Sequence, residues 1–483
     1  MTMVAMCAAG NLLLPVAMYA QNNVQSYVDG TLKTDPRLKN AAVALLAVDE
    51  AGRTVAAWNP EQPLLTASTM KTITTGVALD VLGEHFCFET TVATAGETDA
   101  DGTLHGDVYI IGGGDPTLGS HSDIAEPVDL VFAKWKTALG NCGITSIDGK
   151  IVADASLFSN DIIPETWSWN NIGTDFGSGP CGLSFAENLS YYRVEPGLEE
   201  GDYLWISPVR WVYSEMDLQE LSRTGAPGTG NKLNYYASDL SPSGRFTGTY
   251  AVDRRVDTIA VSNKFPALTC AEAFAGYLAN EGICNLGARY AAAPDTARAV
   301  AKTYSPTLLT ICRETNTISN NFYAETLLMM LGLHLCGEAD YPAATAAVEE
   351  YIGTAGCDTT GLKQADGSGL SRQNYVSPRF FCNFFKMMEK STIFAGYLST
   401  FPTPGAEGTL KYVLAKEPGQ LRSRIHCKSG SLDSVRCYAG YVEAPDGSLL
   451  RFAIQVNNYD CATREIQPAI EGFLKQLALY ERQ

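Results

Sequence analysis

The spacing of hydrophobic positions changes along the chain, and near its start it predicts a hairpin followed by a helix. Two strand-like segments, 41–48 and 54–58, flank the turn-forming run Asp49-Glu50-Ala51-Gly52-Arg53. After this hairpin, apolar residues recur three and four positions apart as far as Leu82, and Gly83 provides a stop signal. We therefore expect an antiparallel strand pair that leads directly into an apolar helix.

The rest of the chain shows three further patterns. Short strands and turns dominate from about residue 88, residues 308–414 are mostly helical, and the end returns to strands before a final amphipathic helix. Further strands are expected at 90–95, 105–111, 147–152, 183–194, 203–212, 232–236, 246–252, 425–428, 436–442 and 449–457. Further helices are expected at 24–32, 126–139, 270–280 and 465–480.

Strands at both ends of the chain predict how the domains are organised. Two N-terminal strands cannot hold a sheet alone, so we expect them to join the three C-terminal strands in one antiparallel sheet. The first and last parts of the chain then form one domain, and the β-rich middle is an insertion. The alternative is three consecutive domains in series, which the length of 483 residues also allows.

Composition and charge narrow the class of protein. Apolar residues make up 46% of the chain and charged residues 18%, which is typical of a globular protein. The net charge of −18 and the absence of a basic run argue against nucleic acid as a partner. Five histidines show no metal-ligand spacing, and Gly112-Gly113-Gly114 lacks the remaining residues of a phosphate-binding loop. We expect no metal and no cofactor, and a tight turn between domains at the glycine run.

The N-terminal 20 residues resemble a secretory signal. They are apolar and small, too short to span a membrane, and followed by polar residues, but no Lys or Arg precedes Lys33. Cys7 lies in a poor lipobox, so we expect cleavage near Ala20 and export to the periplasm. The remaining twelve of thirteen cysteines are compatible either with disulfides or with buried free thiols.

The tetrad Ser68-Thr69-Met70-Lys71 carries the first candidate chemistry. One helical turn separates Ser68 from Lys71, so both side chains can face the same direction. A half-buried lysine at a helix N-terminus can lose its proton near neutral pH and activate the serine as a nucleophile. Because this tetrad also occurs by chance, the assignment depends on the rest of the chain.

Two later motifs fit the same chemistry. Ser319-Asn320-Asn321 precedes a helical run, and Lys428-Ser429-Gly430-Ser431 lies on a predicted strand. Taken singly, the first could be an ordinary helix start and the second a β-turn. A glycine after Lys-Ser on a strand is useful where a ligand backbone approaches closely. Ser-x-x-Lys, Ser-x-Asn and Lys-Ser/Thr-Gly in this order form the signature of penicillin-recognising serine enzymes.

Over nearly its full length the chain resembles the low-molecular-mass class C penicillin-binding proteins, the D-alanyl-D-alanine carboxypeptidase/endopeptidases. The first two motifs are 319 − 68 = 251 residues apart, which leaves room for the inserted domains of this family. Further similar segments are 106–118, Trp167-Ser168-Trp169, 183–188, 366–372 and 405–410.

The resemblance implies an α+β fold. Its penicillin-binding transpeptidase/β-lactamase-like domain, an antiparallel sheet flanked by helices, would comprise residues 21–87 and 286–483. One inserted β-rich domain would comprise 88–114 and 183–285, and a second, nested domain would comprise 115–182.

The resemblance also implies a role for each motif residue. Ser68 would attack the carbonyl of the penultimate D-Ala, and Lys71 would take its proton. Ser319 would relay a proton to the leaving D-Ala nitrogen while Lys428 keeps the pocket positive. Asn321 would bind the amide side of the substrate.

The Lys-Ser-Gly-Ser segment would bind the substrate's C-terminus. Gly430 would leave room for the ligand backbone, and the hydroxyls of Ser429 and Ser431 would receive the carboxylate. The backbone N–H groups of Ser68 and Ser431 would form the oxyanion hole.

One departure from the family concerns the pocket for the third stem residue. Relatives often carry an acid after the second Trp of Trp-Ser-Trp, where this chain has Asn170-Asn171. Asn171 could form only a neutral hydrogen bond with a diaminopimelate amine. Arg372 and Phe176 match other members of this pocket, so its location is expected to be retained.

The implied partners are peptidoglycan stem peptides as substrates, β-lactams as inhibitors and a peripheral association with the cell envelope. Two alternatives remain open: a β-lactamase, for which we find no helper residue for fast deacylation, and a non-catalytic peptidoglycan-binding scaffold.

Overall fold

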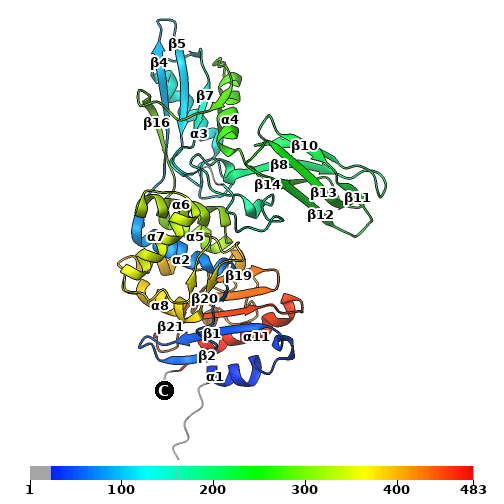
Figure 1. The fold of residues 1–483 in the computed structure, drawn as a ribbon, viewed down its shortest axis with the longest axis vertical. Coiled ribbons are helices and arrows are strands. Elements are labelled where there is room, and N and C mark those ends of the chain that lie inside the picture. Colours follow the sequence, from blue (N-terminus) through cyan, green and yellow to red (C-terminus); the bar gives the residue numbers. More distant parts are fainter. Residues whose placement is uncertain (1–22, 160–161, 482–483) are drawn as a thin grey trace, which may run out of the picture.

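The computed structural model describes residues 23–159 and 162–481. The predicted signal segment 1–20, with Cys7, lies outside the described residues. Strands from the two ends of the chain form one sheet (Figure 1). Its order is β19-β20-β21-β1-β2, and all four neighbouring pairs are antiparallel. The strands are β1 (Ala42–Val48), β2 (Thr54–Trp58), β19 (Ile425–Leu432), β20 (Val435–Glu443) and β21 (Leu449–Asn457). The expected union of two early and three late strands is confirmed.

Helices cover both faces of this sheet. On one face α1 (Asn23–Tyr27) and α11 (Thr463–Ala478) pack together over an apolar layer. On the other face α8 (Pro378–Met388) lies against β1 and β21. The other helices on that side are α2 (Lys71–Leu82), α5 (Leu308–Ile318), α6 (Asn321–Cys336), α7 (Tyr341–Thr354) and α9 (Phe394–Ser399). The predicted α+β architecture, an antiparallel sheet flanked by helices, is therefore confirmed.

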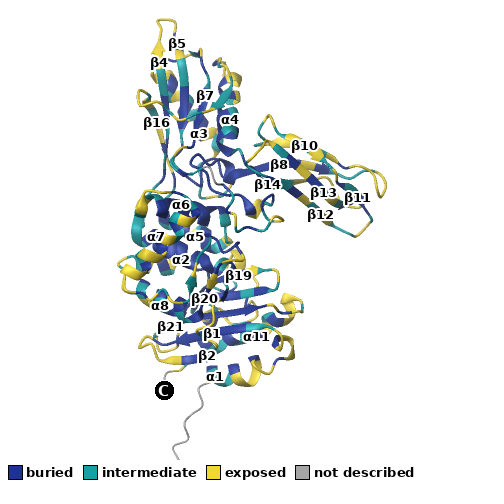
Figure 2. Ribbon diagram, in the orientation of Figure 1, coloured by how far each residue is buried: buried dark blue, intermediate teal, exposed yellow. Residues whose placement is uncertain are grey.

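The middle of the chain folds above this domain into three further sheets (Figure 1). The largest has the order β15-β7-β5-β4-β16, with β6 beside β5, and α3 (Val128–Asn141) and α4 (Pro266–Asn280) pack on it. Its strands are β4 (Glu89–Thr98), β5 (Thr103–Ile111), β6 (Ser146–Ile147), β7 (Ile151–Asp154), β15 (Ala288–Tyr290) and β16 (Arg298–Tyr304). Buried apolar residues of the sheet and of the two helices form one cluster, and Figure 2 shows buried residues along the strands of this sheet.

The other two sheets of the middle region form a separate projection (Figure 1). One has the order β14-β8-β9, and the other combines β10, β13 and β11 with β12 beside β13. Their strands are β8 (Leu189–Glu195), β9 (Trp205–Arg210), β10 (Asp217–Glu220), β11 (Arg223–Gly225), β12 (Asn231–Ala237), β13 (Ser243–Ala251) and β14 (Asp257–Ser262). Small apolar clusters hold them together.

Strand pairing differs from the predicted boundaries of the inserted domains. β7 was expected in a nested domain, but it pairs with β5 and β15, and β16 returns to β4. The strands of 189–262 pair only with one another, apart from isolated bridges. The reason is that β15 and β16, whose apolar residues are Ala and Tyr apart from Val300 and which were not predicted, close the first sheet from far along the chain. We propose that the inserted domains follow the sheets, with residues 189–262 as the inner one.

Local backbone conformation explains one shifted element. The strand expected over 183–194 begins only at Leu189, because Ala186, Glu187 and Asn188 all have positive φ, at 52°, 57° and 53°. The tight turn expected at the glycine run lies just after it, at 116–119, and the run itself forms no turn. Close packing is what requires glycine there: a Cβ at Gly113 would lie 1.8 Å from the carbonyl oxygen of Glu89.

Over the described part of the chain, all twelve cysteines have free thiols, and seven of them are buried. No helix in the described ranges has both the length and the apolar character needed to cross a bilayer.

We predict that Phe385→Ala destabilises the sheet domain. The Phe385 ring is fully buried between α8 and the sheet, with its centroid 5.0 Å from that of Tyr441. Removing it leaves a cavity and should lower the free energy of unfolding by about 3–5 kcal/mol, measured by denaturant titration. Tyr412→Ala, which truncates a ring that is 80% exposed, is the control and should change it by less than about 0.5 kcal/mol. Equal effects of the two variants would contradict the packing described.

Candidate active site

The chain is fixed on both sides of Ser68. The backbone N–H of Leu65 donates to Asn457 Oδ1 at 2.9 Å, which ties this segment to β21. Ser68 then lies in a short 3-10 helix, Ala67–Met70, which leads into α2. Ala67 has a positive φ of 45°, so the chain turns sharply just before Ser68. The expected serine at a helix start, with a stop at Gly83, is present.

Lys71 is fully buried and donates to three oxygens. Its Nζ lies 3.0 Å from Ser68 Oγ, 2.6 Å from Asn321 Oδ1 and 2.9 Å from the carbonyl oxygen of Ser368. Burial lowers the pKa of Lys71 to about 7, although Glu325 and Asp366 oppose the shift. The lysine is therefore poised to exchange a proton with Ser68 near neutral pH.

Two buried carboxyl groups lie behind Lys71. Glu325 accepts hydrogen bonds from the N–H groups of Gly367 and Ser368, at 2.8 and 2.9 Å. Asp366 accepts from the indole of Trp167 at 2.9 Å and from the N–H groups that follow it. Burial, and next the charge of Asp366, raise the pKa of Glu325 to about 8. These acids fix the segment whose carbonyl oxygen holds Lys71.

Ser319 and Lys428 form a second hydroxyl–amine pair. Lys428 Nζ donates to Ser319 Oγ at 2.9 Å and to the carbonyl oxygen of Ser429 at 2.8 Å. Ser319 has a left-handed backbone, φ 64°, between α5 and α6, which separates the two helices. Burial lowers the pKa of Lys428 well below its usual value, and the positive charge of Lys71 lowers it further.

Strand β19 lines the site as the edge strand of the sheet. A Cβ at Gly430 would lie 2.6 Å from the carbonyl oxygen of Thr66 and 3.0 Å from the nitrogen of Ser68, so only glycine fits here. Ser429 Oγ donates to Thr409 Oγ1 at 3.1 Å, and the Arg436 guanidinium donates to Ser431 Oγ. Both hydroxyls therefore have polar neighbours at an open strand edge.

The three residues expected around a substrate side chain lie at the rim. The carbonyl oxygen of Phe176 accepts a hydrogen bond from Asn321 Nδ2 at 2.9 Å, and the Phe176 side chain is 47% exposed. Arg372 donates to the carbonyl oxygen of Asp433 at 3.2 Å, just beyond Ser431. The carbonyl oxygen of Asn171 accepts from Thr174 within the same turn as Phe176. No described hydrogen bond joins the Asn171 side chain to Ser319, Asn321 or Lys428.

A cavity of about 310 Å³ opens beside the second pair. Ser319, Asn321, Phe176 and Asp175 are among the residues that line it.

The structure brings the three motifs together as two linked pairs. Asn321 bridges them, since it follows Ser319 by two residues and binds Lys71. Within the described residues, no hydrogen bond connects Ser68 Oγ directly to Ser319 or Lys428. Gly430 nevertheless touches the backbone of Ser68, so the Lys-Ser-Gly strand and the nucleophile share one wall.

Several contributing residues were not predicted. Glu325 lies four positions after Asn321 on α6, a spacing that places it on the same helix face. Asp366 and Ser368 lie in a segment recognised only as similar to the family. Thr409 lies in another such segment, 405–410. Arg436 carries no local signal, because only the pairing of β19 with β20 brings it opposite Ser431. In the described ranges, no group of three or more His, Cys, Asp or Glu side chains could hold a metal ion.

The fold and the lysine-paired serine define a serine peptidase of the penicillin-recognising class. The model of the D-Ala-D-Ala carboxypeptidase 3 (S13) family matches residues 24–477. The chain belongs to this family, as the order of the three motifs led us to expect.

Individual relatives agree with the family assignment. The chain is 26% identical over 468 residues to a D-alanyl-D-alanine carboxypeptidase of Actinomadura sp. (strain R39), covering 93% of this chain and 84% of that protein. It is 24% identical over 470 residues to a D-alanyl-D-alanine carboxypeptidase of Haemophilus influenzae, covering 95% and 94%. The crystal structure of penicillin binding protein 4 from Haemophilus influenzae covers 94% of this chain and 98% of its own, with a TM-score of 0.80 at 22% identity. The predicted fold class is thereby confirmed.

We predict that Glu325→Gln destabilises the site. A glutamine offers one acceptor oxygen, so one of the two buried N–H groups of Gly367 and Ser368 loses its partner. The free energy of unfolding should fall by about 1–3 kcal/mol, measured by denaturant titration. Glu350→Gln, at an exposed position on α7, is the control and should have no measurable effect. A Glu325 variant as stable as this control would show that the second acceptor oxygen of Glu325 is dispensable.

Proposed function

We propose that this protein is a serine D-Ala-D-Ala carboxypeptidase and DD-endopeptidase that acts on peptidoglycan stem peptides through an acyl-enzyme on Ser68. The observation that carries the proposal is the buried Lys71 ammonium 3.0 Å from Ser68 Oγ, with a pKa of about 7. With this pKa, a large share of the Lys71 side chains is neutral near pH 7, and a neutral amine beside the hydroxyl is a competent general base.

In the first step Lys71 takes the hydroxyl proton as Ser68 Oγ attacks the carbonyl carbon of the penultimate D-Ala. The negative charge that develops on the carbonyl oxygen is met by the backbone N–H groups of Ser68 and Ser431. One such donor is typically worth about 10²–10³ in rate. The close contact of Gly430 with the backbone of Ser68 supports this arrangement, because it brings the strand to the nucleophile.

In the second step the bond to the leaving nitrogen breaks, and this nitrogen receives a proton through Ser319. The 2.9 Å hydrogen bond from Lys428 to Ser319 Oγ supports the relay. Water then attacks the acyl-enzyme, releasing the shortened stem peptide and restoring the Ser68 hydroxyl. Asn321 holds the substrate amide while its oxygen keeps Lys71 in place.

The terminal carboxylate of the substrate binds at Ser429 and Ser431. Arg436 beside Ser431 adds a positive charge at this end of the strand. A bound carboxylate would also raise the lowered pKa of Lys428, since a nearby negative charge favours the ammonium form. Lys428 therefore takes up its positive charge when the substrate carboxylate is bound.

The substrate's third residue would lie near Phe176, Arg372 and Asn171, with weak selectivity for a charged amine. β-Lactams would acylate Ser68 as substrate mimics, which is supported by the structure of the Haemophilus influenzae protein complexed with a β-lactam, similar at a TM-score of 0.76. Export to the periplasm and peripheral association with the cell envelope fit a peptidoglycan substrate.

Fluorescent penicillin and muropeptides test the activity. The wild-type protein should become covalently labelled and Ser68→Ala should not, because the variant lacks the nucleophile. Mass analysis of muropeptide digests should show loss of D-Ala from uncross-linked peptides and separation of cross-linked ones. Labelling of Ser68→Ala would refute the assignment of the nucleophile. Rapid release of hydrolysed penicillin without attack on muropeptides would instead identify a β-lactamase.

We predict that acylation accelerates as pH rises through about 7. The base must be neutral, and the pKa of Lys71 is lowered to about 7, so the rate should climb about tenfold per pH unit below this value and level off above it. Stopped-flow labelling with penicillin between pH 5 and 9 measures the profile, and circular dichroism at each pH controls for unfolding. A flat profile from pH 5 to 8 would contradict Lys71 as the base.

A further inference from the structure

The loop 171–177 connects the active site to the inserted region. At its end the Phe176 carbonyl oxygen accepts a hydrogen bond from Asn321 Nδ2 at 2.9 Å. The other end of the same amide, Asn321 Oδ1, accepts from Lys71 at 2.6 Å. An asparagine amide that is held at both ends has one orientation, and this orientation presents an acceptor to Lys71.

Strand β14 of the inserted region holds this loop by its backbone. Ser262 Oγ donates to the carbonyl oxygen of Ile172 at 2.8 Å, and the N–H of Ser262 donates to that of Gly173 at 3.1 Å. Thr174 forms a β-bridge with Val261. The middle of the loop is thus an additional edge of the β14 sheet.

Lys264 completes the attachment two residues after β14. Its Nζ donates to the carbonyl oxygen of Gly177 at 3.0 Å, directly beside Phe176 in sequence. The residue is only 4% exposed, which is uncommon for a lysine. The proposed chemistry gives this buried amine no role of its own.

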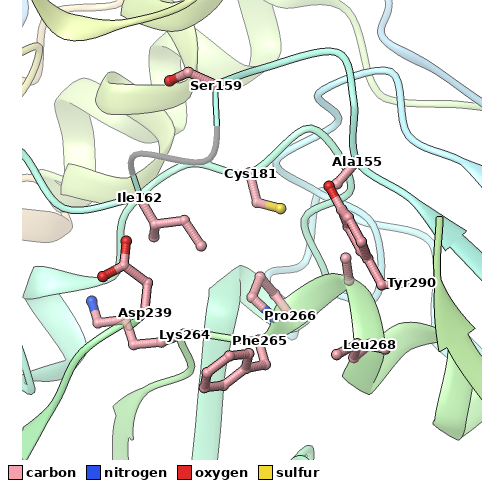
Figure 3. Close-up of a pocket in the computed structure, with 11 residues that line it drawn as sticks. Ala155, Ser159, Ile162, Cys181, Asp239, Lys264, Phe265, Pro266, Leu268 and Tyr290 are labelled. Carbon is pink, nitrogen blue, oxygen red and sulfur yellow. The ribbon is translucent and has the colours of Figure 1, made fainter. Parts of the chain in front are cut away.

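The amine lies at the edge of a cavity of about 370 Å³. Figure 3 shows Lys264 and Asp239 at one end of it, with Phe265, Pro266 and Leu268 along the lower side of the view. Burial lowers the pKa of Lys264 to about 7, against the attraction of Asp239. Since a neutral amine still has N–H groups to donate, the bond to Gly177 is available in either protonation state.

We propose that Lys264 is a positioning residue of the active site: through Gly177 it holds the Phe176 carbonyl oxygen that orients the Asn321 amide toward Lys71. It acts from the inserted region and touches neither substrate nor nucleophile. The inference rests on the proposed function for its readout, acylation of Ser68 by penicillin.

The alternative is that Lys264 only stabilises the inserted region by filling one end of the cavity. The two roles differ in what happens when Asn321 is absent. A residue that acts through Asn321 has no further effect on acylation once the amide is removed, whereas a general loss of stability affects both backgrounds alike.

A double-mutant cycle tests the proposal. Lys264→Met keeps the chain length and removes the donor, and it should slow acylation by fluorescent penicillin about tenfold, because the amide loses its fixed orientation. In the Asn321→Ala background the same change should slow acylation less than about twofold. Lys134→Met, at an exposed position on α3, is the matched control and should leave the rate unchanged.

A second variant guards against misfolding of Lys264→Met. Ser262→Ala removes one side-chain bond to the same loop and should slow acylation in the same direction, by about threefold, with the melting temperature recorded for each variant. If the wild type is labelled and Lys264→Met is labelled at the same rate, the positioning role is overturned and the proposed function is not. A tenfold loss in both backgrounds would overturn it as well. Absence of labelling in the wild type would instead refute the proposed function.

Discussion

The burial of the Lys71 amine is the constraint on which the rest of the site depends. An ammonium taken out of water must be hydrogen-bonded or lose its proton, and here it meets three oxygens from three parts of the chain. Ser68 comes from the same helical turn, Asn321 from the start of α6 and the Ser368 carbonyl oxygen from a loop. Two of these groups have their own support, Glu325 for the loop and the Phe176 carbonyl oxygen for the amide. A change in any of these hydrogen bonds therefore changes the proton affinity of Lys71.

The five-stranded sheet explains how the two ends of the chain serve one site. The hairpin of β1 and β2 leads directly to Ser68, and its pairing with β21 brings in the three C-terminal strands. β19 thereby becomes the edge strand beside Ser68. An insertion between the ends is tolerated because the sheet closes without it. The inserted region still reaches back to the site through the loop that contains Phe176.

Much of this arrangement could be predicted from the sequence. The spacing of apolar residues predicted the hairpin, the helix after Ser68 and the last strands. The order of the three motifs predicted the family and singled out Ser68, Lys71 and Lys428 as the candidate nucleophile and amines. The inserted domains were less predictable: the apolar residues of β15 and β16 are Ala and Tyr apart from Val300, and the partner strands lie more than a hundred residues away. Their assignment depends on pairing, which local patterns do not encode.

The sequence by itself determined that Ser68 and Lys71 lie beside each other, because one helical turn separates them, and that side chains alternate between the two faces of the Lys-Ser-Gly-Ser strand. Only the tertiary structure decided the proton affinity of Lys71, since burial and the acids behind it come from distant segments. It also decided that a lysine of the inserted region, Lys264, stands behind the loop that orients Asn321. Proton affinities and orientations depend on what surrounds a group in space, and that is set by the folding of the whole chain.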